Sequence, residues 1–173
     1  MNRLRTLFLL SCFVLVSCSL SAQIEWLSWE EAVKKNRQQP KKILVDVYTD
    51  WCGWCKTMDK KVFADPVIAA YVKEHFYAVK FDAEQKETLK YDGHTFNFNT
   101  EIGRRGSHEL AYALLDGRMS YPSIVYLDEN RDRISISPGF KPADKFINEL
   151  NFIKGGHYRT KTYQEFLTSL GKK

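Results

Sequence analysis

The run Ile43–Tyr48, "ILVDVY", most constrains the fold of this chain. Its apolar character is continuous except for one acid, as is typical of a central strand buried on both faces. Just beyond it come Cys52 and Cys55, each directly preceded by a tryptophan. A helix that begins at about Cys52 places both side chains on one face, within the roughly 4.4–6.8 Å Cα separation that a disulfide allows. The pattern therefore predicts a strand, a sharp turn and a helix with a cysteine pair at its start.

The rest of the chain alternates helical and extended patterns, which predicts a single α/β domain at residues 23–173. Helices are predicted at residues 28–39, 52–63, 65–76, 107–117, 142–152 and 162–170. Strands are predicted at residues 42–49 and 77–83, and an antiparallel hairpin at residues 123–137. A second hairpin is predicted around Asp92–Gly93, which favours a two-residue turn. Ser107 is the expected N-cap of the helix that ends near Gly117.

The stretch "ILVDVYTDWCGWCK" resembles the active-site strand and turn of thioredoxin, including the tryptophan before the first cysteine and the lysine after the second. The segment "VKFD" resembles the next strand of that family, and Tyr121-Pro122 stands where the family has a cis-proline. The "CK-x-M" motif followed by Val62, Phe63, Asp65 and Pro66 is similar to exported thioredoxin-like proteins. The resemblance covers residues 42–152. It implies a thioredoxin fold, a central mixed β-sheet flanked by helices, with an inserted hairpin-helix segment at about residues 84–120 before the cis-proline.

The cysteine pair is predicted to be a redox switch. A structural disulfide that closes so short a loop constrains little of the unfolded chain, so stability is a poor reason for the pair. At a helix start, exposed backbone N–H groups and the positive end of the helix dipole stabilise the thiolate form of Cys52. We expect Cys52 to attack a partner disulfide and Cys55, deeper and less exposed, to resolve the mixed disulfide. No cofactor is expected beyond the Cys52–Cys55 disulfide.

Asp46 and Lys80 have two interpretations each. Asp46 is either an acid at a strand edge or a buried carboxylate with a raised pKa that exchanges a proton with Cys55. The thioredoxin resemblance assigns the second role to Asp46 and places Lys80 beside it. The alternative for Lys80 is a surface lysine at a strand edge.

Five residues around the cysteines are expected to contact substrate: Trp51, Gly53, Trp54, Tyr121 and Pro122. The resemblance implies a cis peptide bond before Pro122, which presents the backbone of Tyr121 to substrate. We expect Trp51 to pack and Trp54 to be partly exposed, forming a flat apolar docking site with Tyr121. Because thioredoxin carries proline at the position of Trp54, the resemblance predicts no reduction potential.

Residues 1–22 are predicted to be a signal peptide. A short positive region precedes about ten apolar residues, which is too few to span a bilayer. We favour cleavage after Ala22; alternatively "LVSC" resembles a lipobox in which Cys18 would be lipidated and would attach the protein to the membrane. Either form predicts a periplasmic or cell-envelope protein.

The predicted function is an exported thiol–disulfide oxidoreductase that reduces disulfides of cysteine-containing exported proteins, with electrons from a membrane relay protein. Disulfide isomerase or oxidase activity is the alternative within that class, and a copper or metal chaperone is the alternative outside it. No metal site is predicted, because His75, His94, His108 and His157 lack ligand spacing. The segment "GRRGSHEL" fits either an anion site at Arg104 and Arg105 or a solvated loop. The net charge of +5 falls to +3 without Arg3 and Arg5 of the predicted signal peptide, and a charge that small predicts no nucleic-acid partner.

Overall fold

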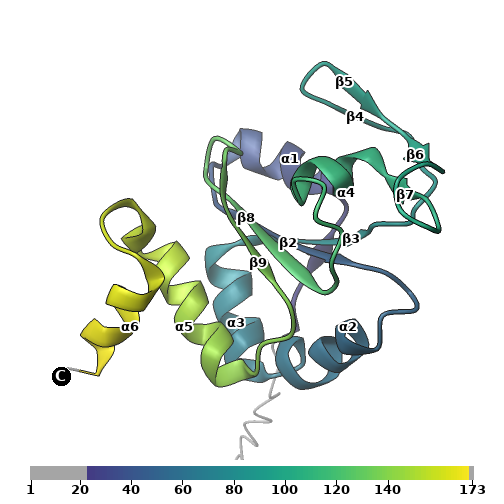
Figure 1. The fold of residues 1–173 in the computed structure, drawn as a ribbon. Coiled ribbons are helices and arrows are strands. Elements are labelled where there is room, and N and C mark those ends of the chain that lie inside the picture. The colour runs from purple at the N-terminus through teal and green to yellow at the C-terminus, as the bar shows by residue number, and fades with distance from the viewer. Residues whose placement is uncertain (1–22, 172–173) are drawn as a thin grey trace, which may run out of the picture.

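A five-stranded mixed sheet forms the centre of the computed structural model, which describes residues 23–171 (Figure 1). The predicted signal peptide lies outside the described residues. The strands of the sheet are β1 (Trp26–Leu27), β2 (Ile43–Tyr48), β3 (Tyr77–Asp82), β8 (Ser123–Leu127) and β9 (Arg133–Pro138). Their order is β1-β3-β2-β8-β9; β1, β3 and β2 are parallel, whereas β8 and β9 are antiparallel to their neighbours. The predicted mixed sheet is confirmed, and β2 is its central strand.

Helices cover both faces of this sheet (Figure 1). They are α1 (Trp29–Gln38), α2 (Gly53–Met58), the π-helical η1 (Asp59–Phe63), α3 (Pro66–His75), α4 (Glu109–Leu114), α5 (Ala143–Lys154), the 3-10 turn η2 (His157–Arg159) and α6 (Tyr163–Leu170). One apolar core contains side chains of α1 and α4, and the other contains side chains of α2, η1, α3, α5 and α6. Within residues 23–171, no helix is long and apolar enough to cross a membrane.

Local sequence explains where several helices begin. Ser28 and Glu31 form the predicted capping box of α1, in which each side chain accepts the backbone N–H of the other residue. The Asp65 side chain caps α3 and Pro66 occupies its first position, where a missing N–H costs nothing. These caps set where α1 begins before the cysteine-bearing segment and where α3 begins after it.

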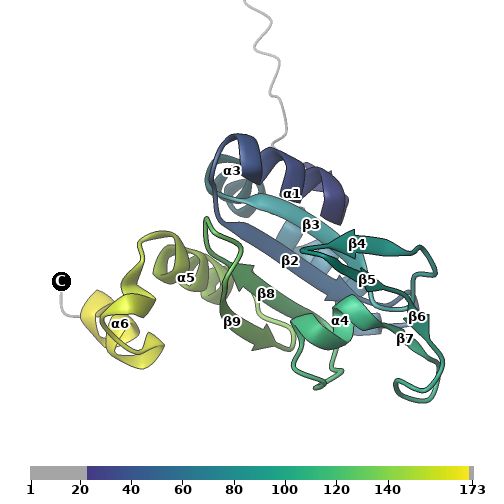
Figure 2. The same cartoon turned by 90° about the horizontal axis from the view of Figure 1, so that it is seen from above.

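The inserted segment contains two small ladders and a helix (Figure 2). Strands β4 (Leu89–Tyr91) and β5 (His94–Phe96) form the predicted hairpin, and Asp92 and Gly93 both have positive φ, as its turn requires. Strands β6 (Phe98–Asn99) and β7 (Ser107–His108) form a second ladder that the sequence pattern did not predict.

The N-cap prediction for α4 was wrong. Ser107 is paired in β7, and the imidazole of His108 caps the helix by accepting the Leu110 N–H at 3.2 Å. The other ring nitrogen of His108 lies 2.9 Å from the Glu87 carbonyl, so it is the one that donates. Both nitrogens of this fully buried ring are therefore occupied by the fold.

Candidate active site

The two cysteines lie where the chain leaves β2 and enters α2. Cys52 is the N-cap of α2, and its Sγ accepts the backbone N–H of Cys55 at 3.1 Å. The two residues form a disulfide with a Cα–Cα separation of 5.3 Å. In this oxidised state Cys52 is 5% exposed and Cys55 is 2% exposed, so Cys55 is the deeper of the two. The Cys55 N–H donates to Cys52 Sγ at the positive end of the helix dipole, which favours the thiolate form of Cys52 when the disulfide opens.

A buried ion pair lies on the face of the sheet that α2 and η1 cover. Asp46 is 1% exposed, and its Oδ2 accepts a hydrogen bond from Lys80 Nζ at 2.6 Å across the β2–β3 register. Burial raises the pKa of Asp46 to about 6, although the Lys80 ammonium opposes this shift. Asp46 Oδ1 has no hydrogen-bond partner among the described residues. The expected burial and raised pKa of Asp46 are both present in the structure.

Lys80 is held on several sides. Burial acts against its charged form, but the carboxylates of Asp46 and Asp59 together outweigh burial and raise the pKa of Lys80. Three aromatic rings also surround the ammonium, with their centres 5.1, 4.9 and 5.2 Å from Nζ: Trp26, Tyr48 and Phe63. The interpretation of Lys80 as a surface lysine at a strand edge is therefore wrong, because its side chain is 19% exposed and β3 lies between β1 and β2; Lys80 is a counter-charge to Asp46.

Asp59 is a charged neighbour of the site that sequence reasoning missed. Its carboxylate pairs with Lys80 from the first residue of η1. The signal was its spacing, since Asp59 follows Cys55 by four residues and so shares a helix face with it. Asp59 thus connects the cysteine-bearing helical segment to the Asp46–Lys80 pair. Its own side chain is 42% exposed, so the row of three charged groups reaches the surface at Asp59.

Trp51 does not pack as expected. Its residue is 53% exposed, because it lies in the turn after β2 rather than in either core. Its ring meets Tyr121 edge to face at 5.9 Å, and its Nε1 donates to Glu84 at 2.9 Å. The peptide bond between Tyr121 and Pro122 is cis. The ring beside Tyr121 is thus Trp51, not Trp54.

Trp54 lies on the other side of the cysteine pair. It is 62% exposed, in line with the expectation, and its ring lies 5.4 Å from that of Phe140 in the loop after β9. Gly53, between Cys52 and Trp54, has open space around the position of a Cβ. The exposed aromatic surface around the disulfide therefore has two parts, Trp51 with Tyr121 and Trp54 with Phe140.

A groove of about 340 Å³ opens beside Trp51, and we call it the insertion groove. It is lined by side chains next to the cysteines and by the inserted segment: Trp51, Glu84, residues 102–107, Met119 and Tyr121. Arg104 and Arg105 both belong to this lining, and Arg105 Nε lies 3.6 Å from Glu84 Oε1. The inserted segment therefore lies directly against the cysteine-bearing face.

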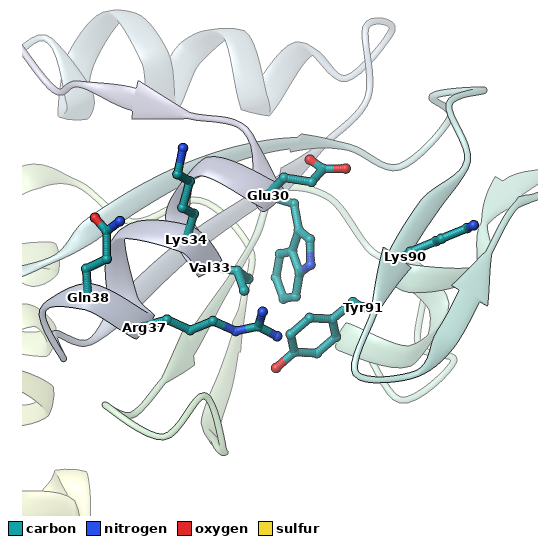
Figure 3. Close-up of a pocket in the computed structure, with 8 residues that line it drawn as sticks. Glu30, Val33, Lys34, Arg37, Gln38, Lys90 and Tyr91 are labelled. Carbon is teal, nitrogen blue, oxygen red and sulfur yellow. The ribbon is translucent and has the colours of Figure 1, made fainter.

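A second hollow, the α1–β4 pocket, has about 410 Å³ and lies between α1 and the β4–β5 hairpin (Figure 3). Figure 3 shows the Arg37 side chain extending along it toward the ring of Tyr91. Trp29 and Tyr91 meet there edge to face at 5.0 Å. Its lining comes entirely from α1 and β4 and includes neither a cysteine nor any residue near Pro122. This pocket is larger than the insertion groove but remote from the cysteine chemistry.

The histidines are not gathered into a ligand set. Among residues 23–171, no group of three or more histidine, cysteine, aspartate or glutamate side chains is close enough to hold a metal ion. Arg104 and Arg105, for which an anion site and a solvated loop were the two interpretations, both line the insertion groove.

The fold and the dithiol site define a thioredoxin-like protein of the disulfide oxidoreductase type. A solved structure titled DsbH Oxidoreductase has a TM-score of 0.55 with 17% identity, covering 76% of this chain and 84% of that one. A protein of Bacteroides thetaiotaomicron, described as a candidate disulphide-isomerase, has a TM-score of 0.54 with 25% identity, covering 76% and 93%.

The family described as "Thioredox_DsbH: Protein of unknown function, DUF255" matches residues 7–150, and the chain belongs to it. The thiol:disulfide interchange protein DsbD of Actinobacillus pleuropneumoniae is 26% identical over 125 residues, which are 68% of this chain and 17% of DsbD. The matched segments span less than a fifth of the first curated relatives that the chain resembles.

Proposed function

We propose that this protein is an exported thiol–disulfide oxidoreductase that reduces disulfide bonds of other exported proteins. The observation that carries the proposal is the Cys52–Cys55 disulfide at the start of a helical segment whose Asp59 pairs with Lys80, the partner of the buried Asp46. Similarity to DsbD, which is named a thiol:disulfide interchange protein, supports the same class of reaction.

The proposed reaction begins from the reduced pair. The Cys52 thiolate attacks one sulfur of a substrate disulfide, which forms a mixed disulfide and releases the other substrate sulfur as a thiolate. Asp46 takes the proton of Cys55, and the resulting Cys55 thiolate attacks Cys52 Sγ. The second substrate sulfur leaves, and two electrons have moved from the dithiol to the substrate. The product state is the disulfide of Cys52 and Cys55, and a membrane electron-relay protein is the proposed source of electrons for the next cycle.

Insulin reduction with two serine variants tests the mechanism. Cys52→Ser removes the attacking thiolate, so we expect the rate to fall by on the order of 10³-fold or more. Cys55→Ser keeps the attack but not the release, so we expect a covalent enzyme–substrate disulfide on a non-reducing gel. The two variants are matched in chemistry and differ in position by one helical turn. Activity that survives Cys52→Ser would contradict the mechanism.

The direction of electron flow is tested by the reduction potential. Dithiol proteins of this kind span about −270 to −120 mV, and a reductase belongs near the lower end. A value near −120 mV would exclude the reductase reading. Disulfide isomerisation is the second candidate, because the B. thetaiotaomicron structure with a similar fold carries that description. Refolding of scrambled ribonuclease by the reduced protein distinguishes it from simple reduction.

Two further parts of the proposal have direct tests. Export with cleavage after Ala22, or lipidation at Cys18, is distinguished by the mass of the mature protein purified from the cell envelope. The metal-chaperone alternative predicts stoichiometric copper in protein purified without oxygen. Copper at that level would replace the oxidoreductase proposal.

A further inference from the structure

The insertion groove lies beside the residue that precedes the attacking cysteine. Trp51 directly precedes Cys52 and Tyr121 directly precedes Pro122, and both side chains line the groove. A peptide whose disulfide sulfur contacts Cys52 therefore places a neighbouring residue beside these two rings. A volume of about 340 Å³ has room for a large side chain. The inserted segment thus contributes directly to the surface that a substrate meets.

The charges that line this groove are unbalanced. Glu84 is already engaged, because its Oε1 accepts the Trp51 Nε1 hydrogen bond at 2.9 Å and lies 3.6 Å from Arg105 Nε. The Arg105 guanidinium also lies 5.8 Å from the Trp51 ring centre. Arg104 is exposed and makes no salt bridge within residues 23–171. The uncompensated positive charge of the lining therefore belongs to Arg104.

Acidic side chains at the ends of β2 and β3 contrast with the arginines that line the insertion groove. Asp82 ends β3 and Asp50 follows β2, and their mutual repulsion adds to burial in raising the pKa of Asp82. Neither residue lines the insertion groove. A carboxylate on a substrate is thus disfavoured beside the strand ends and favoured at the arginine side, which orients the bound chain.

The loop that carries Arg104 is held at both ends. Asn99 pairs with Ser107 in the β6–β7 ladder, and the His108 N–H donates to the Ala83 carbonyl at 2.7 Å, which ties the loop to the end of β3. Gly106 has a φ of +77°, and a Cβ there would lie 2.3 Å from the Phe98 ring. The arginine side of the groove is therefore positioned before any substrate arrives, which lowers the entropy cost of binding.

We propose that the insertion groove selects substrate proteins that carry an acidic side chain next to the cysteine under attack, with Arg104 as its ion-pair partner and Trp51 and Tyr121 as its apolar wall. This proposal rests on the proposed function, since it names the substrates of the same dithiol. The carboxylate stays ionised and no bond to it forms; its role is to hold the substrate sulfur in line with Cys52 Sγ.

The test uses the full-length mature protein, reduced, and three peptides that differ only at the residue next to a single cysteine: glutamate, glutamine or lysine. Each peptide cysteine is linked by a disulfide to thionitrobenzoate. Attack by the Cys52 thiolate forms the Cys52–peptide disulfide and releases the coloured thionitrobenzoate anion, whose appearance gives the second-order rate constant. The glutamate peptide should react about three- to tenfold faster than the lysine peptide at low salt. The ratio should approach one at 1 M salt.

Two arginine variants make the test specific. Arg104→Glu should invert the preference, so that the lysine peptide reacts faster. Arg37→Glu is the matched control, because Arg37 is also exposed, makes no salt bridge within the described chain and lines the α1–β4 pocket. This variant makes the same charge change and should leave the glutamate-to-lysine ratio as in the unchanged protein.

The outcomes separate this inference from the proposed function. Equal rates for all three peptides, or the same shift from Arg37→Glu as from Arg104→Glu, would overturn the assignment of the groove while the dithiol remains active. Failure of every peptide to react would instead count against the oxidoreductase proposal itself. Inversion by Arg104→Glu alone supports the groove assignment.

Discussion

Asp46 and Trp29 are both buried, and each has a polar atom without a hydrogen-bond partner among the described residues. Trp29 is 3% exposed and lines the α1–β4 pocket, and its Nε1 is a neutral donor on a ring that meets Phe81 and Tyr91 edge to face. Asp46 lies in β2, the strand that leads to the dithiol, and its unpartnered oxygen belongs to a carboxylate whose pKa is raised by burial. The α1–β4 pocket, of about 410 Å³, thus lies over the group that cannot exchange a proton, whereas a hollow of about 420 Å³ lined by Lys80 and Asp59 lies beside the ion pair of the group that can.

The difference separates a packing site from a chemical one. An unpartnered neutral N–H in an aromatic cluster costs some stability but changes nothing when the pH changes. An unpartnered carboxylate oxygen beside Lys80 makes the stability of the fold depend on protonation. The two hollows have almost the same volume, so volume does not distinguish them, whereas the charge of the buried group beside each one does.

The largest expected effect on stability comes from the buried Trp29. Trp29→Ala removes a buried indole from one of the two cores, and we expect it to lower the free energy of unfolding by about 3–5 kcal/mol in urea. The rate of disulfide reduction by the folded protein should stay within about twofold. Trp51→Ala is the matched control: this indole is exposed, so its removal should cost less than about 1 kcal/mol. A large loss in the rate of disulfide reduction by folded Trp29→Ala would show that the Trp29 region also contributes to the chemistry.

Asp46→Asn should give the next largest effect, and it depends on pH. The pKa of about 6 in the fold exceeds the ordinary value of 3.8, so the folded state binds the proton more tightly than the unfolded state does. The stabilisation is therefore complete below pH 3.8 and is lost as the pH rises through 6, by roughly 3 kcal/mol. The asparagine variant of the oxidised protein lacks this loss, so its stability relative to the unchanged protein should rise by roughly 2.5 kcal/mol from pH 4 to pH 7.5.

Urea unfolding at both pH values measures this difference, with Asp144→Asn as a control because that carboxylate is exposed on α5. The same Asp46→Asn protein should release substrate from the mixed disulfide roughly ten- to a hundredfold more slowly at pH 7, because no group accepts the proton of Cys55. A pH-independent difference in stability would show that Asp46 does not titrate in this range.

The smallest expected effect distinguishes the N–H of Trp29 from its ring. Trp29→Phe removes the unpartnered donor together with part of the buried ring area, and these changes oppose each other. We expect a change of about 1 kcal/mol or less in the free energy of unfolding. A loss as large as that of Trp29→Ala would mean that Nε1 makes a stabilising contact. The Trp29 region would then, like the Asp46 region, depend on a polar interaction.

The sequence predicted the parts of the fold that local patterns determine. The apolar run of β2, the capping box at Ser28 and the Asp92–Gly93 turn all depend on neighbouring residues, and all are present. Strand β1 has only two residues and exists because it pairs with β3, so its local pattern is too short to detect. The cap at His108 was missed because Ser107 is a better cap in isolation, but ladder pairing with β6 takes that residue.

The candidate site was predictable to the same extent. Cys52 and Cys55 were found from their spacing at a predicted helix start, and the role of Asp46 followed from the thioredoxin resemblance; the structure places Asp46 in β2 and both cysteines at the start of α2. The ion pair of Asp59 with Lys80 and the contact of Trp54 with Phe140 join distant segments through side chains alone. The position of the Trp51 ring depends on contacts with Glu84 and Tyr121, which lie more than thirty residues away along the chain. Such contacts follow from tertiary packing and have no periodic signal.

The placement of α6 has a practical consequence for studying this protein. In both views α6 lies at the opposite end of the molecule from the β4–β5 hairpin (Figures 1 and 2). A fluorophore, affinity handle or sensor surface attached after this helix is therefore well away from the inserted segment. Immobilised protein can be cycled between oxidising and reducing buffers while binding is recorded, without the attachment chemistry competing for the same side of the molecule.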